Sequence, residues 1–104
     1  MQECSVNEIE GLEYVIVRTY SAGVFAGYLQ KMDGKFVTLK KARRIWYWEG
    51  AASLSQLAME GTSLPERCKF PIEVDSILLT EAIEIISCTE AARKSIKSVP
   101  VWSA

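Results

Sequence analysis

The stretch YVIVRTYSAGVFAGYLQKMDGKFVTL, residues 14–39, decides the fold of this chain. β-Branched and aromatic residues, which fit the pleated and half-buried surface of a sheet, dominate residues 14–20 and residues 24–31. The pair Asp33-Gly34 separates the second run from residues 36–39, and an Asp-Gly pair between two apolar runs is the strongest short signal of a hairpin. The sequence therefore predicts an antiparallel meander of three strands.

Residues 43–48, RRIWYW, form the next run of strand-forming side chains. A strand here would place Arg44, Trp46 and Trp48 on one face and Arg43, Ile45 and Tyr47 on the other. One of the two faces has to join the core. The other face is then free to meet solvent or a ligand.

A short helix is predicted within residues 50–61. Ser53 is a suitable N-cap, and Gly61 suits the left-handed position that follows the last turn because it has no Cβ atom. The next ten residues, 62–71, contain two prolines and are predicted to form a loop.

The C-terminal third alternates between strand and helix signals. Residues 72–74 suit a short edge strand, and residues 77–86, ILLTEAIEII, are interpreted as one strand because β-branched side chains are dense there. Ser87 and Glu90 have the spacing of a capping box, which predicts a helix over residues 89–99.

These elements together predict a mainly β fold of the α+β type. We expect a small, strongly bent antiparallel sheet or open barrel with a short central helix and a C-terminal helix, in a single domain of residues 1–104. Apolar residues make up 49% of the chain and charged residues 24%, so the composition is that of a globular protein. Trp102, which follows Pro100, is expected to fold back onto the body.

The charge of the chain argues against duplex DNA as a partner. Twelve basic and thirteen acidic residues give a net charge of −1, so no global positive field is present. The centre is nevertheless basic, through Lys31, Lys35, Lys40, Lys41, Arg43 and Arg44. An anionic ligand is therefore expected to meet the central third.

Several classes of protein are disfavoured by what the sequence lacks. The three cysteines, Cys4, Cys68 and Cys88, have no CxxC spacing, and there is no histidine, which argues against a zinc site, a disulfide framework or a histidine-based catalytic triad. No nucleotide-cofactor fingerprint and no membrane-length apolar run occur. The acidic start MQECSVNEIE lacks the features of a secretory signal. We expect a cytoplasmic protein that is not an enzyme and holds no metal or cofactor.

The candidate ligand site combines charge and aromatic faces within six residues, at Arg43, Arg44, Trp46, Tyr47 and Trp48. Guanidinium groups bind phosphates in bidentate fashion, and bases stack on aromatic rings, so this cluster suits a nucleotide. The alternative is structural, with the tryptophans as core anchors and the arginines on a solvated face. A second option for phosphate is the start of the short helix, at Ser53 and Ser55, and its alternative is an ordinary helix cap.

Part of the chain resembles the first motif of Sm-like small barrels, through Gly23, Gly27, Leu29, Met32-Asp33, Leu39 and Ala42. The resemblance implies a strongly bent open barrel that can assemble in a ring. The resemblance would also imply RNA binding. However, the asparagine that contacts bases in that family is absent here, and Gly23 and Gly27 are one residue closer together than the glycines of the family motif.

A longer resemblance covers most of the chain. The strings EYVIVRTYSAGVFAGYL, ARRIWYW, GAASLSQLA and CKFP are similar to small uncharacterised proteins of tailed phages and prophages. This resemblance implies an accessory phage protein that acts inside the bacterial host. By analogy with phage sponges we expect a homo-oligomer that sequesters a small anionic, cyclic nucleotide signal. The alternative is a protein-interaction inhibitor of a host defence or metabolic enzyme.

Overall fold

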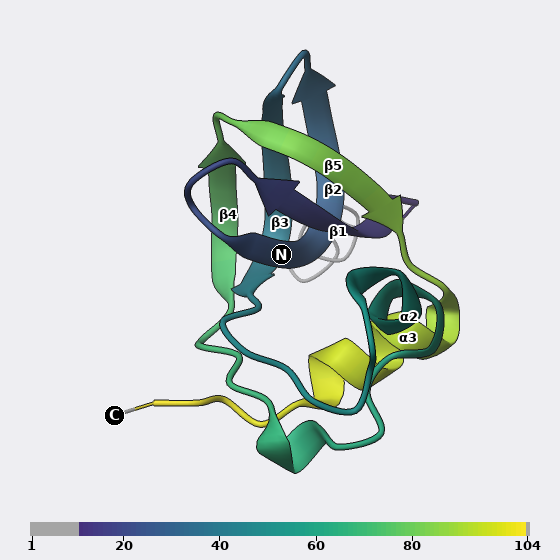
Figure 1. The fold of residues 1–104 in the computed structure, drawn as a ribbon. Helices are drawn as coiled ribbons and strands as arrows, with labels where there is room; N and C mark the ends of the chain where they lie inside the picture. The colour runs from purple at the N-terminus through teal and green to yellow at the C-terminus, as the bar shows by residue number, and fades with distance from the viewer. Residues whose placement is uncertain (1–10, 104) are drawn as a thin grey trace, which may run out of the picture.

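The predicted meander is present in the computed structural model, which describes residues 11–103 (Figure 1). It consists of β1 (Glu13–Thr19), β2 (Val24–Asp33) and β3 (Phe36–Arg44), paired antiparallel in that order. Asp33 pairs with Phe36, so the central residues of the hairpin turn are Gly34 and Lys35, one position beyond the Asp-Gly pair. Cys4 and the acidic start lie outside the described residues.

A β-bulge bends the sheet where β2 passes Gly27. The register shifts between Ala26 and Tyr28, so that Lys41 and Ala42 of β3 both face Gly27. Lys41 takes a positive φ of 51°, and a Cβ atom on Gly27 would lie 3.1 Å from the Ala42 Cα atom. The bend at Gly27 is therefore a close approach of two backbones, and bulges of this kind increase the twist of a sheet.

The single strand predicted for residues 77–86 is wrong. The segment forms two strands, β4 (Val74–Leu79) and β5 (Ala82–Ser87), and β4 begins at the end of the edge strand predicted for residues 72–74. β4 pairs with β3 and β5 pairs with β1, which gives the sheet order β4-β3-β2-β1-β5. Strand propensity is the same for one long strand and two short ones, so it does not locate the turn at Thr80-Glu81.

The helices begin at side-chain caps. Helix α2 (Leu54–Glu60) has the expected N-cap, Ser53, and ends at Gly61, whose φ is 77°. A 3-10 turn, η1 (Pro65–Arg67), interrupts the predicted loop. Helix α3 (Glu90–Ser98) is capped by the Thr89 hydroxyl, which accepts a hydrogen bond from the Ala92 amide, and not by Ser87 as the capping-box spacing indicates.

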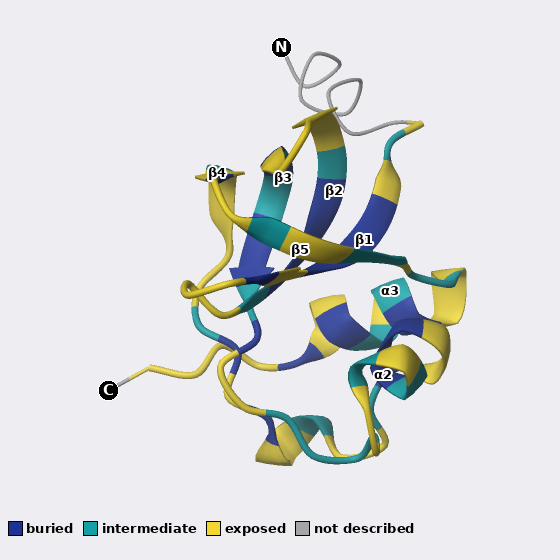
Figure 2. Ribbon diagram, turned by 45° about the horizontal axis from the view of Figure 1, so that its top comes forward, coloured by how far each residue is buried: buried dark blue, intermediate teal, exposed yellow. Residues whose placement is uncertain are grey.

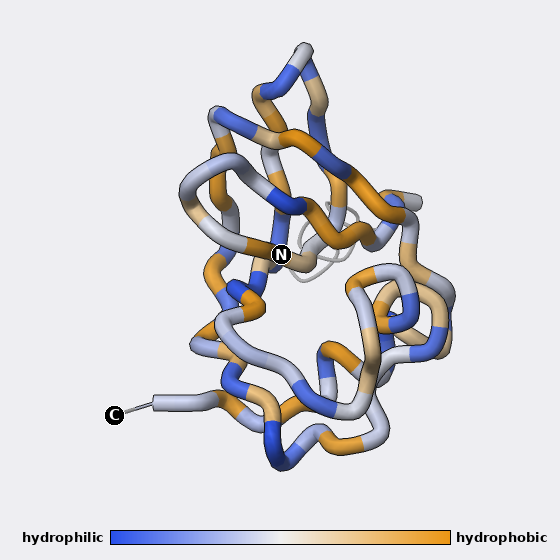
Figure 3. Tube along the Cα trace, viewed as in Figure 1, coloured by the Kyte–Doolittle hydropathy of each residue, from blue (hydrophilic) through white to orange (hydrophobic). Residues whose placement is uncertain are grey.

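The bent sheet has a core on each of its faces. Both helices lie against one side of the sheet (Figure 1), where Tyr14, Ile16, Leu57 and Ile96 are buried together. The inner face of the bend holds a second cluster, made of Val15, Val17, Phe25, Val37, Leu39, Ala42 and Leu79. Strand β1 is therefore buried on both faces (Figure 2), and hydrophobic segments recur along the strands of the trace (Figure 3). The predicted mainly β, strongly bent open sheet with two helices is confirmed.

Stability is expected to fall when the pH is raised above 9, because of the partly buried Cys88 thiol and the buried Tyr14 phenol. Burial raises the pKa of the Cys88 thiol to about 12, and burial also raises the pKa of Tyr14. The unfolded chain then loses these protons at a lower pH than the folded chain, so stability that is present below pH 9 is lost as the pH rises. Thermal melts between pH 8 and pH 11 check this. Cys88→Ala should show a shallower fall than the parent, and an equal fall would contradict the assignment to this thiol.

Candidate functional site

The strand predicted for residues 43–48 ends early. β3 stops at Arg44, and residues 45–49 form an irregular segment that keeps a single bridge, between Tyr47 and Lys69. The expected alternation still separates the two arginines, because Arg43 lies on the helix side of the sheet and Arg44 on the inner side. The five residues of the predicted cluster therefore do not share one site.

Arg43 is a structural residue and not a ligand contact. Its side chain is 3% exposed, and its guanidinium donates to three backbone carbonyls, those of Pro71, Ile96 and Phe70, at 3.3, 2.9 and 3.2 Å. The Ile96 carbonyl belongs to the last turn of α3, where a positive charge is favourable. The prediction that Arg43 binds phosphate is corrected here, because every nitrogen of its guanidinium is used inside the fold.

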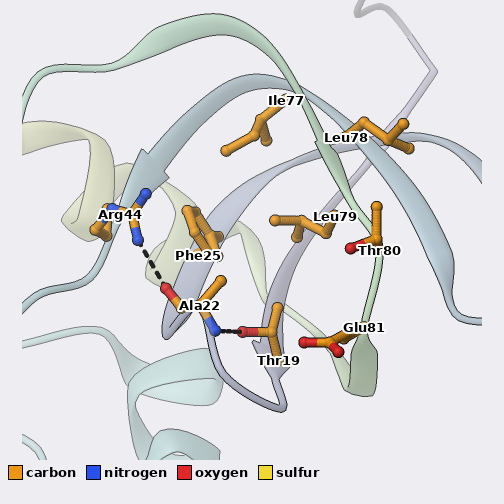
Figure 4. A pocket seen from close by; sticks show the side chains of 9 residues that line it. All are labelled: Thr19, Ala22, Phe25, Arg44, Ile77, Leu78, Leu79, Thr80 and Glu81. Atoms are coloured by element: carbon orange, nitrogen blue, oxygen red, sulfur yellow. Dashed lines mark hydrogen bonds between the residues drawn. The ribbon is translucent and has the colours of Figure 1, made fainter.

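Arg44 lies over a groove at the open side of the sheet (Figure 4). Its guanidinium carbon is 4.5 Å from the centroid of the Phe25 ring, and its Nη1 donates to the Ala22 carbonyl at 2.7 Å. Cavities of about 150 and 210 Å³ lie beside it, and both are lined by Arg44, Phe25 and Ile77. Because the Phe25 ring is 2% exposed, the groove offers an incoming base no open aromatic face.

The three predicted aromatic residues separate into one anchor and two exposed side chains. Trp48 is half-buried against the helix-side core, and its Nε1 donates to the Ala51 carbonyl at 3.2 Å. Trp46 is 64% exposed and Tyr47 is 43% exposed. The structural interpretation therefore holds for Trp48, while Trp46 and Tyr47 are available for contacts.

Tyr47, Lys69 and Trp102 form what we call the aromatic surface. Its scaffold is three segments that lie side by side, because Tyr47 bridges Lys69, and Phe70 bridges Val101 while accepting a hydrogen bond from the Trp102 amide. The Lys69 ammonium is 5.6 Å from the Tyr47 ring centroid and 5.7 Å from the Trp102 ring centroid. Trp102 does fold back onto the body, as expected, and stays 43% exposed.

The cation that meets the aromatic rings is thus Lys69, and the sequence does not predict it. Lys69 lies in a segment with two prolines, 22 positions beyond Tyr47. A fold-back of Trp102 indicates that this ring reaches the body, but it does not indicate which side chain it meets. The Tyr47 hydroxyl donates to the Glu49 carboxylate at 2.5 Å, which raises the pKa of Tyr47.

The start of helix α2 is an ordinary cap. The Ser53 hydroxyl accepts from the Gln56 amide at 3.1 Å, and the Gln56 side chain accepts from the Ala52 amide at 2.7 Å. Ser55 is exposed on the helix surface. The Gln56 amide is therefore bonded to the cap, which matches the alternative of an ordinary helix cap, and the phosphate role of Ser53 and Ser55 stays a prediction.

The described part of the chain limits the chemistry further. Within residues 11–103, no cluster of three or more Cys, Asp and Glu side chains could hold a metal ion. No helix of that range is long and apolar enough to cross a membrane. The described residues offer the aromatic surface, the groove beside Arg44 and a further cavity of about 260 Å³ along the β2–β3 hairpin, lined by Lys31, Asp33, Phe36, Thr38 and Leu78.

Comparisons with known proteins give one match. A family model described as "Domain of unknown function (DUF6948)" matches residues 12–96, which covers every strand and most of helix α3. Searches of curated proteins and of solved structures returned no match.

Proposed function

Since the chain belongs to the family described as a domain of unknown function (DUF6948), its role has to be argued from its own surface, and we propose that it is a non-catalytic binding protein that docks on a protein partner through the aromatic surface. The observation that carries the proposal is the exposure of Tyr47 and Trp102 around Lys69. Exposed tyrosine and tryptophan side chains dominate the binding energy of protein interfaces.

The shape of the aromatic surface supports a protein partner over a small ligand. Small ligands are normally enclosed in a concavity, and the cavities beside Arg44 are lined by neither Tyr47 nor Trp102. Trp46, which is next to Tyr47 in the chain, is also exposed, at 64%. The resemblance to tailed-phage proteins supports a bacterial host enzyme or defence complex as the partner, which the protein would inhibit from the host cytoplasm.

A small anionic nucleotide is the second candidate, because Lys69 places a positive charge between two aromatic rings. A base would stack on Tyr47 or Trp102, for roughly 1–3 kcal/mol, while the ammonium group meets a phosphate. In this proposal the protein is a homo-oligomeric sponge for a cyclic nucleotide signal. Lys69 then binds the phosphate, which is the role predicted from the sequence for Arg43 and Arg44.

Variants of the aromatic surface test the protein-partner candidate. Trp102→Ala and Tyr47→Ala are expected to lose binding to the partner, whereas Tyr20→Ala, which removes a ring that is 78% exposed elsewhere, should bind as the parent does. The partner is captured from bacterial extract on the immobilised protein, identified by mass spectrometry and then titrated as a purified protein. Binding that Trp102→Ala leaves unchanged would rule out the aromatic surface.

The nucleotide candidate is measured by melting the parent with cyclic dinucleotides, cyclic trinucleotides and cyclic ADP-ribose isomers. A ligand at a hundred times its dissociation constant adds about 2.7 kcal/mol of stability, so binding raises the melting temperature. The rise should vanish in Lys69→Ala. A flat result across the panel leaves the protein partner as the proposed function.

A further inference from the structure

The groove beside Arg44 borders a strand edge that has no partner. β4 pairs with β3 on one side and is the last strand of the sheet, and no described residue forms a backbone hydrogen bond with its other edge. Unpaired edges of this kind are templates for a further strand. Five consecutive residues at the end of β4 and in the turn that follows line one cavity, from Ile77 to Glu81 (Figure 4). A cavity bordered by consecutive residues meets the edge of the strand as well as one face.

The two cavities adjoin one another, because Phe25, Arg44 and Ile77 line both, and together they offer room for side chains from one face of an extended chain. The cavity of about 210 Å³ lies along Val74 and Ile77, and the cavity of about 150 Å³ lies along Ile77 and Leu79. Arg44 is common to both cavities and is the only cation in their linings. In a strand, residues two positions apart point to the same side, roughly 7 Å apart. Each cavity has room for a side chain the size of valine or leucine.

Arg44 supplies the charge that selects the residue between the two apolar side chains. Its Nη1 donates to the Ala22 carbonyl, while its Nε and Nη2 have no acceptor among residues 11–103. A carboxylate that enters the groove would accept from these free donors, which is a charge-assisted pair. The cavity of about 210 Å³ is otherwise apolar, with Phe25, Ala42 and Ile72 in its lining. The cavity of about 150 Å³ is also lined by Thr19, Thr80 and Glu81, and the Glu81 carboxylate accepts a hydrogen bond from Ser21.

We propose that β4 and the groove beside Arg44 form a docking site for an extended segment of a partner protein, which adds a strand to β4. The segment has the pattern apolar-x-acidic-x-apolar: its acidic side chain pairs with Arg44 and its apolar side chains fill the two cavities. Main-chain hydrogen bonds to the edge supply the affinity, and the two cavities and Arg44 supply the specificity. This site is separate from the aromatic surface and does not depend on the proposed function.

The test is selection of displayed random twelve-residue peptides on the immobilised full-length chain. The enriched peptides should carry an acidic residue flanked two positions away by aliphatic residues. A synthetic peptide of that consensus should bind Arg44→Gln at least tenfold more weakly than the parent. Arg44→Glu should reject it and accept the same peptide with lysine at the acidic position. Tyr47→Ala should bind the peptide as the parent does. Loss of peptide binding in Arg44→Gln therefore tests the groove alone, and loss of partner binding in Tyr47→Ala tests the aromatic surface alone.

A second measurement separates strand addition from simple groove binding. Methylation of the peptide amides at one alternate set of positions should abolish binding, and methylation at the other set should leave it unchanged, because only one set faces β4. Enriched peptides that bind Arg44→Gln equally, or an equal response to both methylated sets, would overturn the proposal. So would light scattering that shows an Arg44-dependent dimer, since a second copy would then occupy the edge.

Discussion

Arg43→Ala is expected to destabilise the domain by about 3–5 kcal/mol, because it removes three hydrogen bonds from a charged donor, each worth about 1.5–3 kcal/mol at most, together with the packing of a buried side chain. The change removes the Arg43 donor from three carbonyls; that of Pro71 loses its side-chain partner, while those of Ile96 and Phe70 keep the amides of Val99 and Trp102 as donors. It also removes the guanidinium that lies 5.4 Å from the Phe70 ring centroid. Urea unfolding followed by tryptophan fluorescence measures the loss.

Arg44→Ala is the matched control, because it removes the same side chain from the opposite face of the same strand. It loses one hydrogen bond and one contact with the Phe25 ring, so we expect a cost of about 1 kcal/mol. Equal losses in the two variants would show that Arg43 does not hold α3 and the 70–71 segment in place.

Gly50→Ala is expected to cost about 2–4 kcal/mol, through backbone strain and a steric clash together. Gly50 has a φ of 88°, and a Cβ atom there would lie 2.6 Å from the Leu64 amide nitrogen and 2.7 Å from that of Ser63. These are backbone atoms, so the loop from residue 50 to residue 64 has to move as a whole. Thermal melts and urea midpoints report the change.

Gly34→Ala is the control that measures the cost of backbone strain without a steric clash. Gly34 also has a positive φ, of 61°, but nothing lies within 4 Å of its added Cβ atom. We expect about 1–2 kcal/mol for this variant, the cost of a left-handed backbone alone. If Gly50→Ala is no less stable than Gly34→Ala, the loop of residues 50–64 moves away from the added methyl group without a loss of folding free energy.

The fold was predictable where local signals and the tertiary structure agree. Residues 14–39 combine strand propensity with a two-residue turn signal, and the capping residues Ser53 and Gly61 fix the ends of α2. Residues 77–86 show the limit, since the turn inside them depends on Tyr20, whose amide donates to the Glu81 carbonyl at 2.9 Å. That contact joins positions about sixty residues apart, and no local pattern contains it.

The site was predictable only in part for the same reason. Alternation correctly placed Arg43 and Arg44 on opposite faces, but it did not indicate that the helix-side face was closed by the end of α3. Burial of Arg43 depends on Ile96 and Phe70, and the pairing of rings with a cation depends on Lys69 and Trp102. A pattern of six residues identifies the chemistry that is available, and the distant segments decide which side chains remain exposed.

The sheet order has a consequence for the kinetics of folding. β1 pairs with β2 across a tight turn, whereas its other neighbour, β5, lies more than sixty residues further along the chain. Contacts between residues so far apart are formed late and slow the folding of small domains into the millisecond-to-second range. During synthesis the three-stranded meander is complete long before β5 leaves the ribosome. One edge of β1 therefore stays unpaired, with its apolar residues uncovered, until the last fifth of the chain has been made.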